Sequence, residues 1–171
     1  PITIVVANSG DDSVSLFRVR NAAPFTSSSW YTLEPLTTIR GIPAPYAVAA
    51  CEARTSTMVL VTSPGDNSVT VLRVPDGVVL GKINVGPQPH AVACIPDTAT
   101  NSYKGIVSNV GDDSLAVLDV GSRTVEARIP GVAGSRGPHG IVVYGVVGGG
   151  LRAWVAGTQA DAVSIVDLST Y

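Results

Sequence analysis

Val61-Thr-Ser-Pro-Gly-Asp-Asn-Ser-Val-Thr-Val-Leu-Arg-Val74 is one of four related stretches, and the others begin at Val6, Val107 and Val155. Each stretch reads as an apolar strand, a polar turn rich in Asp or Asn, and a second apolar strand. The start of the second strand recurs at spacings of 55, 46 and 48 residues, at Val14, Val69, Leu115 and Val163. A period of this length predicts a repeated supersecondary unit.

A second element recurs between these hairpins, as Pro45-Tyr-Ala-Val-Ala49, Pro89-His-Ala-Val-Ala93 and Pro138-His-Gly-Ile-Val142. A further short strand follows the hairpins, as in Gly81–Val85 and Val125–Ile129. Four strands per unit predict an all-β β-propeller with about four blades of four-stranded antiparallel sheet. We expect one domain over 1–171, with blades at 1–41, 42–86, 87–134 and 135–171.

The register leaves the first and last blades incomplete. The chain opens on the second strand of a blade, at Ile2, and ends after the third strand of another, at Leu168. About 14 strands are expected where four full blades would have about 16. Three arrangements fit: a fragment of a longer propeller, an open arc that assembles with other copies, or a four-bladed propeller with two partial blades.

The repeated phrases resemble the YVTN-type propeller repeat and, more loosely, lactonase-type seven-bladed propellers. The resemblance rests on Asn8–Val14, Gly65–Val69, Asn109–Leu115, Gly86–Val92 and Gly137–Ile141. It covers nearly the whole chain and implies a propeller architecture. It implies no single activity, because such repeats occur in surface proteins, in redox-enzyme domains and in lyases.

Composition excludes several classes of protein. The 171 residues carry a formal net charge of −2, so no basic excess favours nucleic acid. The longest uncharged stretch, Gly137–Leu151, is too short and too rich in glycine for a membrane helix. No motif for a nucleophile, a phosphate loop or a bound cofactor is present.

The two histidines of the chain, His90 and His139, occupy equivalent positions in the repeat, and Tyr46 is the third equivalent. All three begin inner strands, so we expect them at the mouth of the central channel. Imidazoles one blade apart could act as general acid and base, which makes them weak catalytic candidates. A metal site is not expected, because two ligands are too few. The alternative is that they are part of the turn that opens each blade.

Two further groups of residues have structural interpretations. The paired acids of the Gly-Asp-Asp turns lie one turn per blade, which favours turn chemistry over a calcium site. Cys51 and Cys94 differ by one position within the repeat. Because strand side chains alternate, we expect them to face opposite sides and to remain buried free thiols.

Blade one contains an insertion of 11 residues between Val19 and Ile39, relative to the other blades. It carries Phe25, Trp30 and Tyr31, three of the nine aromatic residues. Exposed aromatics on a loop would suit a protein or glycan ligand. The alternative is a loop that covers its own blade.

The sequence therefore favours a non-catalytic propeller scaffold or interaction module over an enzyme. Self-association, or contact with the remaining blades, would cover its open edges. We expect an extracellular, periplasmic or cell-surface location. The alternative is a fragment of a lyase or lactonase-like enzyme that uses His90 and His139. The candidate binding residues are Phe25, Trp30, Tyr31, Tyr46, His90 and His139.

Overall fold

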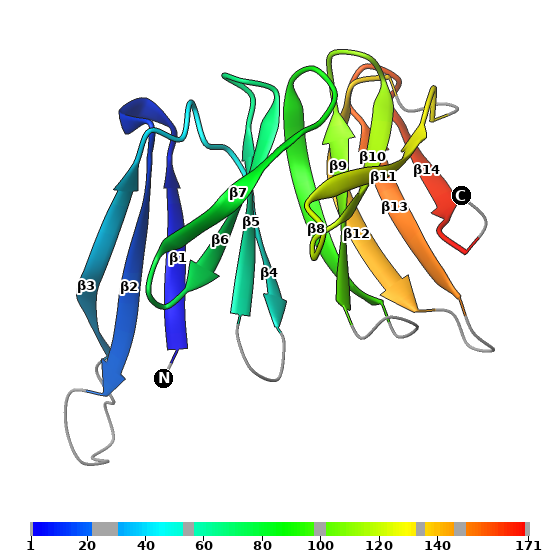
Figure 1. Ribbon diagram of the computed structural model, residues 1–171. Coiled ribbons are helices and arrows are strands. Elements are labelled where there is room, and N and C mark those ends of the chain that lie inside the picture. Colours follow the sequence, from blue (N-terminus) through cyan, green and yellow to red (C-terminus); the bar gives the residue numbers. More distant parts are fainter. Residues whose placement is uncertain are drawn as a thin grey trace.

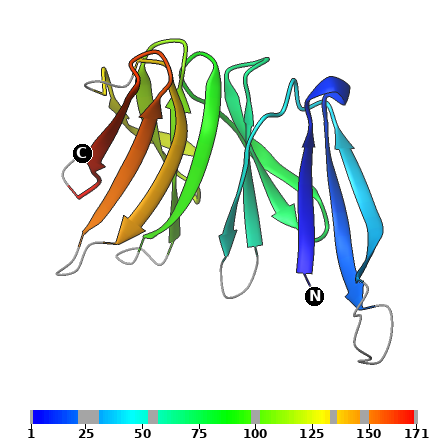
Figure 2. The same cartoon turned by 180° about the vertical axis from the view of Figure 1, so that it is seen from behind.

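The computed structural model describes residues 2–21, 31–52, 57–97, 102–132, 136–145 and 150–169. These residues form four antiparallel sheets that stand side by side in chain order, like the leaves of an open fan (Figures 1 and 2). A single short 3₁₀ turn, Ser9–Asp11, interrupts the strands of the described chain. No helix among these residues is long and apolar enough to cross a bilayer.

Each sheet is a simple meander in which consecutive strands pair. Sheet one contains β1 (Ile2–Asn8), β2 (Ser13–Asn21) and β3 (Tyr31–Arg40). Sheet two contains β4 (Val48–Glu52), β5 (Thr57–Ser63), β6 (Ser68–Val74) and β7 (Val78–Asn84). Sheet three contains β8 (Pro89–Asp97), β9 (Ser102–Asn109), β10 (Ser114–Asp119) and β11 (Thr124–Ile129). Sheet four contains β12 (Pro138–Gly145), β13 (Leu151–Gly157) and β14 (Ala162–Asp167).

The predicted all-β arrangement, with incomplete first and last sheets, is confirmed. The hairpins form where the Asx turns were expected, because residues such as Asn67 adopt the left-handed conformation that a tight turn needs. The four sheets do not close into a ring. The first strands of sheets two, three and four, which are β4, β8 and β12, lie next to one another.

Three apolar cores lie between successive sheets. We call the face that a sheet turns toward the next sheet its forward face, and the opposite face its backward face. The core between sheets one and two contains Val14, Leu16, Ile42, Val59, Val61, Leu72 and Val74. The largest core joins sheets two and three and contains Cys51, Leu60, Val69, Val71, Ile83, Val85, Val92, Val107, Ala116, Leu118 and Val120. The core between sheets three and four contains Ile95, Ile106, Leu115, Val132, Ala153, Val155 and Leu168.

These cores explain why strands in the middle of the chain read as nearly continuous apolar runs. In β6, only Arg73 is exposed, because both faces of sheet two pack against a neighbour. In β14, by contrast, exposed and half-buried positions alternate. Each buried Val or Leu side chain contributes about 1.5–3 kcal/mol relative to an exposed one. The fold is therefore stabilised between sheets rather than within any one of them.

Cys51 and Cys94 form a disulfide with a Cα–Cα distance of 5.5 Å. The expectation of two free thiols is therefore wrong. The two side chains do face opposite sides of their own sheets, as strand alternation requires. Adjacent blades, however, turn opposite faces toward each other. Cys51 on the forward face of sheet two therefore meets Cys94 on the backward face of sheet three.

Candidate functional site

Three rings form a continuous stack along the inner side of the fan. The rings of Tyr46 and His90 have centroids 3.9 Å apart, with an angle of 48° between their planes. His90 and His139 are also 3.9 Å apart, at an angle of 56°. His90 and His139 lie near the start of β8 and β12, as expected, whereas Tyr46 lies just before β4 rather than in it. The ring of His90 contacts both of the other rings.

Hydroxyl groups on the second strand of each complete sheet fix the backbone of this stack. The Thr62 hydroxyl donates to the backbone carbonyl of His90 at 2.9 Å. The Ser108 hydroxyl contacts the backbone carbonyl of His139 at 3.5 Å. Thr62 and Ser108 are equivalent in the repeat, so each sheet positions the histidine of the sheet that follows it.

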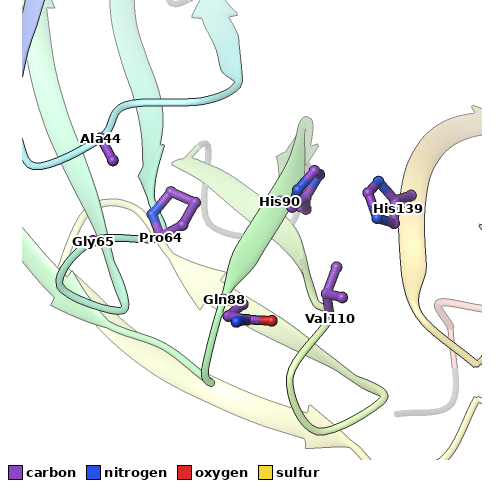
Figure 3. Close-up of a pocket in the computed structure, with 7 residues that line it drawn as sticks. All are labelled: Ala44, Pro64, Gly65, Gln88, His90, Val110 and His139. Carbon is purple, nitrogen blue, oxygen red and sulfur yellow. The ribbon is translucent and has the colours of Figure 1, made fainter. Parts of the chain in front are cut away.

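A cavity of about 510 Å³ opens beside the stack (Figure 3). Its polar lining comes from His90, His139 and Gln88, and its remaining wall is Ala44, Pro64, Gly65 and Val110. Burial lowers the pKa of His90 from its ordinary value, and the nearby His139 lowers that pKa further. A neutral imidazole can donate and accept hydrogen bonds, and it can also accept a proton.

The described polar groups of the cavity are two imidazoles and one amide. Among the residues that the structure describes, no group of three His, Cys, Asp or Glu side chains could hold a metal ion. The described residues that line the cavity beside His90 and His139 include no carboxylate. Its described lining can stack on a ligand or exchange hydrogen bonds with it through His90, His139 and Gln88.

Of the other predicted binding residues, Tyr31 is described, and it does not line this cavity. Phe25 and Trp30 lie outside the described residues. Tyr31 begins β3, and its side chain is 66% exposed. Tyr46, His90 and His139 are thus the predicted binding residues that the structure brings together.

The Asx turns join neighbouring sheets, a role that the sequence analysis missed. The side chain of Asp12 accepts a hydrogen bond from the Ala44 N–H at 2.8 Å. Asn67 accepts one from the Gln88 N–H at 3.0 Å, and Asp113 accepts one from the Gly137 N–H at 2.8 Å. Each donor directly precedes the repeated proline of the next sheet. We call these three bonds the inter-blade tethers. The repeat in register was the signal that could have revealed them.

The first acid of each turn has a local role instead. Asp11, Asp66 and Asp112 each accept a hydrogen bond from the serine two residues later, at 3.0, 2.6 and 2.6 Å. Asp66 also pairs with Lys82 at 2.7 Å, and its pKa lies below the ordinary value: burial opposes this shift, while Lys82 and Ser68 produce it. These contacts agree with the prediction of turn chemistry.

The backward face of sheet one is an exposed apolar surface, which we call the N-terminal flank. Ile2, Ile4 and Val6 lie on this face of β1, with exposed fractions of 66%, 36% and 39%. Phe17 and Val19 pair with Ile4 and Ile2 and extend the same face across β2, since cross-strand partners share a face.

The forward face of sheet four is a second apolar surface, which we call the C-terminal flank. Its central residue is Trp154, which pairs with Val142 on one side and Ile165 on the other. The ring of Tyr144 meets Trp154 edge to face, at 6.0 Å between centroids. Val142, Tyr144 and Trp154 line a wholly apolar hollow of about 320 Å³. Arg152 and Asp167 lie at the rim, 3.9 Å apart.

Residues at the same place in the repeat differ sharply in exposure between the middle and the ends of the chain. Val163 is 58% exposed, whereas its equivalents Val14, Val69 and Leu115 are all 0% exposed. Val6 is 39% exposed, whereas its equivalents Val61, Val107 and Val155 are all 0% exposed. The flanks therefore carry blade-packing side chains in the register that fills the three cores.

Comparison with known proteins supports the fold. No protein-family model and no curated protein matches the chain. Among solved structures, the hydrazine synthase of Kuenenia stuttgartiensis is similar, with a TM-score of 0.74 and 18% identity. A structure of BBS1N in complex with ARL6DN, soaked with lead, is also similar, with a TM-score of 0.68 and 14% identity.

The matches cover 98% and 96% of this chain, but only 43% and 49% of the two similar chains. Both similar proteins contain a β-propeller. The chain accordingly has a β-propeller fold of four sheets, the first and last with three strands. The YVTN-type resemblance stays a prediction.

Proposed function

We propose that this chain is a non-catalytic propeller interaction module whose two flanks are blade–blade interfaces. Other copies of the chain, or further blades of the same fold, would cover them. One observation carries the proposal: positions that are 0% exposed inside the chain, such as Val69, are 58% exposed at its end, in Val163. Neighbouring exposed apolar side chains that form a contiguous patch generally mark an interaction surface.

The disulfide supports a location outside the cytoplasm. Stable disulfides persist in oxidising compartments and are rare in the reducing cytosol. Cys51 is 1% exposed and spans the largest core of the fold, which is typical of a structural bridge rather than a catalytic one. We therefore infer an extracellular, periplasmic or cell-surface role.

Solution mass tests the assembly. We expect the chain to form a defined species heavier than the 17.5 kDa monomer in light scattering. Ile4→Asp and Ile165→Asp, on opposite flanks, should each shift the mass toward that of the monomer, since a charge cannot be buried unpaired. Thr124→Asp, at an exposed position of β11, is the matched control. A charged flank variant that keeps the native mass would overturn the proposal.

The second candidate function is an enzyme that uses His90 and His139. The specific observation in its favour is the cavity of about 510 Å³ beside two adjacent imidazoles. If this function holds, His90→Ala and His139→Ala should abolish turnover while the mass of the assembly stays unchanged. The flank variants should have the reverse effect. The two candidates therefore make opposite predictions for the same set of proteins.

A further inference from the structure

The turn of sheet four contains an acid at the position of the tether acceptors, and this acid has no donor among the described residues. Asp161 occupies the place of Asp12, Asn67 and Asp113 in the repeat. It has the same left-handed backbone, with φ of 49°, against 48°, 56° and 56° in the other three. Its side chain is exposed and makes no hydrogen bond or ion pair with any residue that the structure describes.

The rest of this turn lacks the hydrogen bond that the first acid and the serine form in the other three turns. The first acid is replaced by Ala160, and the serine that would bond to it is replaced by Ala162. Asp161 is therefore the one acid kept in this turn, and it is the one whose equivalents join neighbouring sheets. The left-handed turn itself favours Asp, Asn or Gly at this position, and of these Asp and Asn also carry a side-chain acceptor.

Three series of contacts between blades end on the same side of sheet four: the tethers, the ring stack and the apolar cores. The tether series stops at Asp161. The ring stack stops at His139, which contacts His90 on its other side. The apolar cores stop at the C-terminal flank. Each series is continuous with an interface already formed within the chain. A further blade would therefore continue all three.

We propose that the C-terminal flank receives a further blade of this repeat, one that includes an inner strand. An N–H before the opening proline of that blade donates to Asp161, and the ring that begins its inner strand stacks on His139. The proposal rests on the proposed function and names the partner of one flank.

The first sheet of a second copy fits this position less well. Its β1 is equivalent to β5, β9 and β13, the second strands of the other sheets. Within the described residues, sheet one has no strand equivalent to β8 or β12 and so offers neither the donor nor the ring. The described sheet one of a second copy could cover Trp154, but it contains no partner for Asp161 or His139.

A tandem extension tests the proposal. Leu168 is equivalent to Val120, so residues 121–168 can be repeated directly after Leu168 in the full chain. This addition supplies the outer strand of sheet four and the opening segment of a further blade. Trp30→Phe in the chain, and Phe in place of the repeated tryptophan in the extension, leave Trp154 as the sole indole.

Acrylamide quenching then reports on the flank, because Trp154 is 48% exposed before docking. At dilutions where the unextended chain is monomeric, we expect the extension to lower the quenching constant severalfold and to shift the emission to shorter wavelength. An extension that is folded by circular dichroism but leaves Trp154 equally quenchable would overturn the proposal.

Variants of Asp161 test the tether itself. Asp161→Gly keeps the left-handed turn but removes the acceptor, so the docking equilibrium, followed by quenching through a urea titration, should weaken about 10-fold. Asp161→Asn should behave like the native chain, because Asn67 accepts the same bond in sheet two. Equal urea midpoints for Asp161→Gly and Asp161→Asn would show that the side chain of Asp161 accepts no hydrogen bond from the added blade.

The failure of this proposal can be told apart from the failure of the proposed function. If Trp154 becomes protected only as the unextended chain is concentrated, the occupant is a second copy, and only the present proposal falls. If Trp154 stays exposed in both chains and both remain monomers, the assembly proposal falls as well.

Discussion

Cys51 and Cys94 join neighbouring sheets by a disulfide that crosses the largest core of the protein. They lie on opposite faces of their own sheets and therefore on the same side of the gap between them. The bond closes a loop with a sequence separation of 43 residues. It joins β4, which follows Tyr46, to β8, which contains His90.

Removal of this bridge should destabilise the fold without changing its topology. For a loop of this length, the loss of constraint on the unfolded chain corresponds to roughly 4 kcal/mol as an upper limit. We expect Cys51→Ala with Cys94→Ala to lower the urea midpoint of unfolding substantially. Reduction of the native protein should reproduce the effect, and reduction should leave the double variant unchanged. An unaltered midpoint would contradict a structural role.

Leu60 and Trp154 occupy the same place in the repeat but differ in burial, and therefore in their contribution to stability. Leu60 is 0% exposed, so Leu60→Ala should cost about 2–5 kcal/mol of unfolding free energy. Trp154 is 48% exposed in the isolated chain, and Trp154→Ala should cost about 1 kcal/mol or less. Chemical denaturation of dilute monomer measures both. A large loss from Trp154→Ala would mean that the C-terminal flank is already packed.

His90 makes stability depend on pH in the mildly acidic range. Burial, and secondarily His139, place the pKa of folded His90 below its ordinary value of 6.5. The unfolded chain therefore binds a proton more readily than the folded chain, and the unfolding free energy should fall as the pH drops from about 7 toward the folded-state pKa. Above this window the group contributes no pH dependence.

Two measurements check this sign. Titration of the imidazole resonances should give His90 a pKa lower than that of an unstructured histidine. His90→Gln should flatten the pH dependence of the unfolding free energy in this range. If the native protein instead gains stability on acidification through this window, the assignment to His90 is wrong.

The tether between Asp113 and Gly137 can be tested within the chain. Asp113 is left-handed, with φ of 56°, so Asp113→Gly keeps the turn while the Gly137 N–H loses its acceptor. The cost should be about 1–2 kcal/mol of unfolding free energy. Asp113→Asn is the control, because Asn67 accepts the equivalent bond in sheet two. Similar losses of unfolding free energy from Asp113→Gly and Asp113→Asn would show that the tether does not cause the loss.

Much of the fold was predictable because its information is local and repeated. The Asx turn at Asn67 and the apolar alternation beside it recur in register, so one correct hairpin assignment predicts the others. The positions of His90 and His139 on inner strands followed from the same register. The distance of 3.9 Å between their ring centroids did not follow from the register, because it depends on how far one sheet is rotated against the next.

The cysteines also separate what a single strand determines from what the packing of two sheets determines. Alternation along a strand correctly separates Cys51 and Cys94 onto opposite faces, and that rule alone led to the wrong conclusion of free thiols. The missing information was which face of one sheet meets which face of the next. Likewise, the role of Asp12 as a tether needs the neighbouring sheet, since its donor Ala44 is 32 residues away.

The order of residues was thus sufficient for what depends on one strand and its turn: the hairpins, the four sheets and the apolar faces. Contacts between sheets, including the disulfide, the tethers and the stacked rings, depend on the packing of side chains from distant segments. Dense packing of the cores sets the distance and angle between sheets, and no local pattern encodes that quantity.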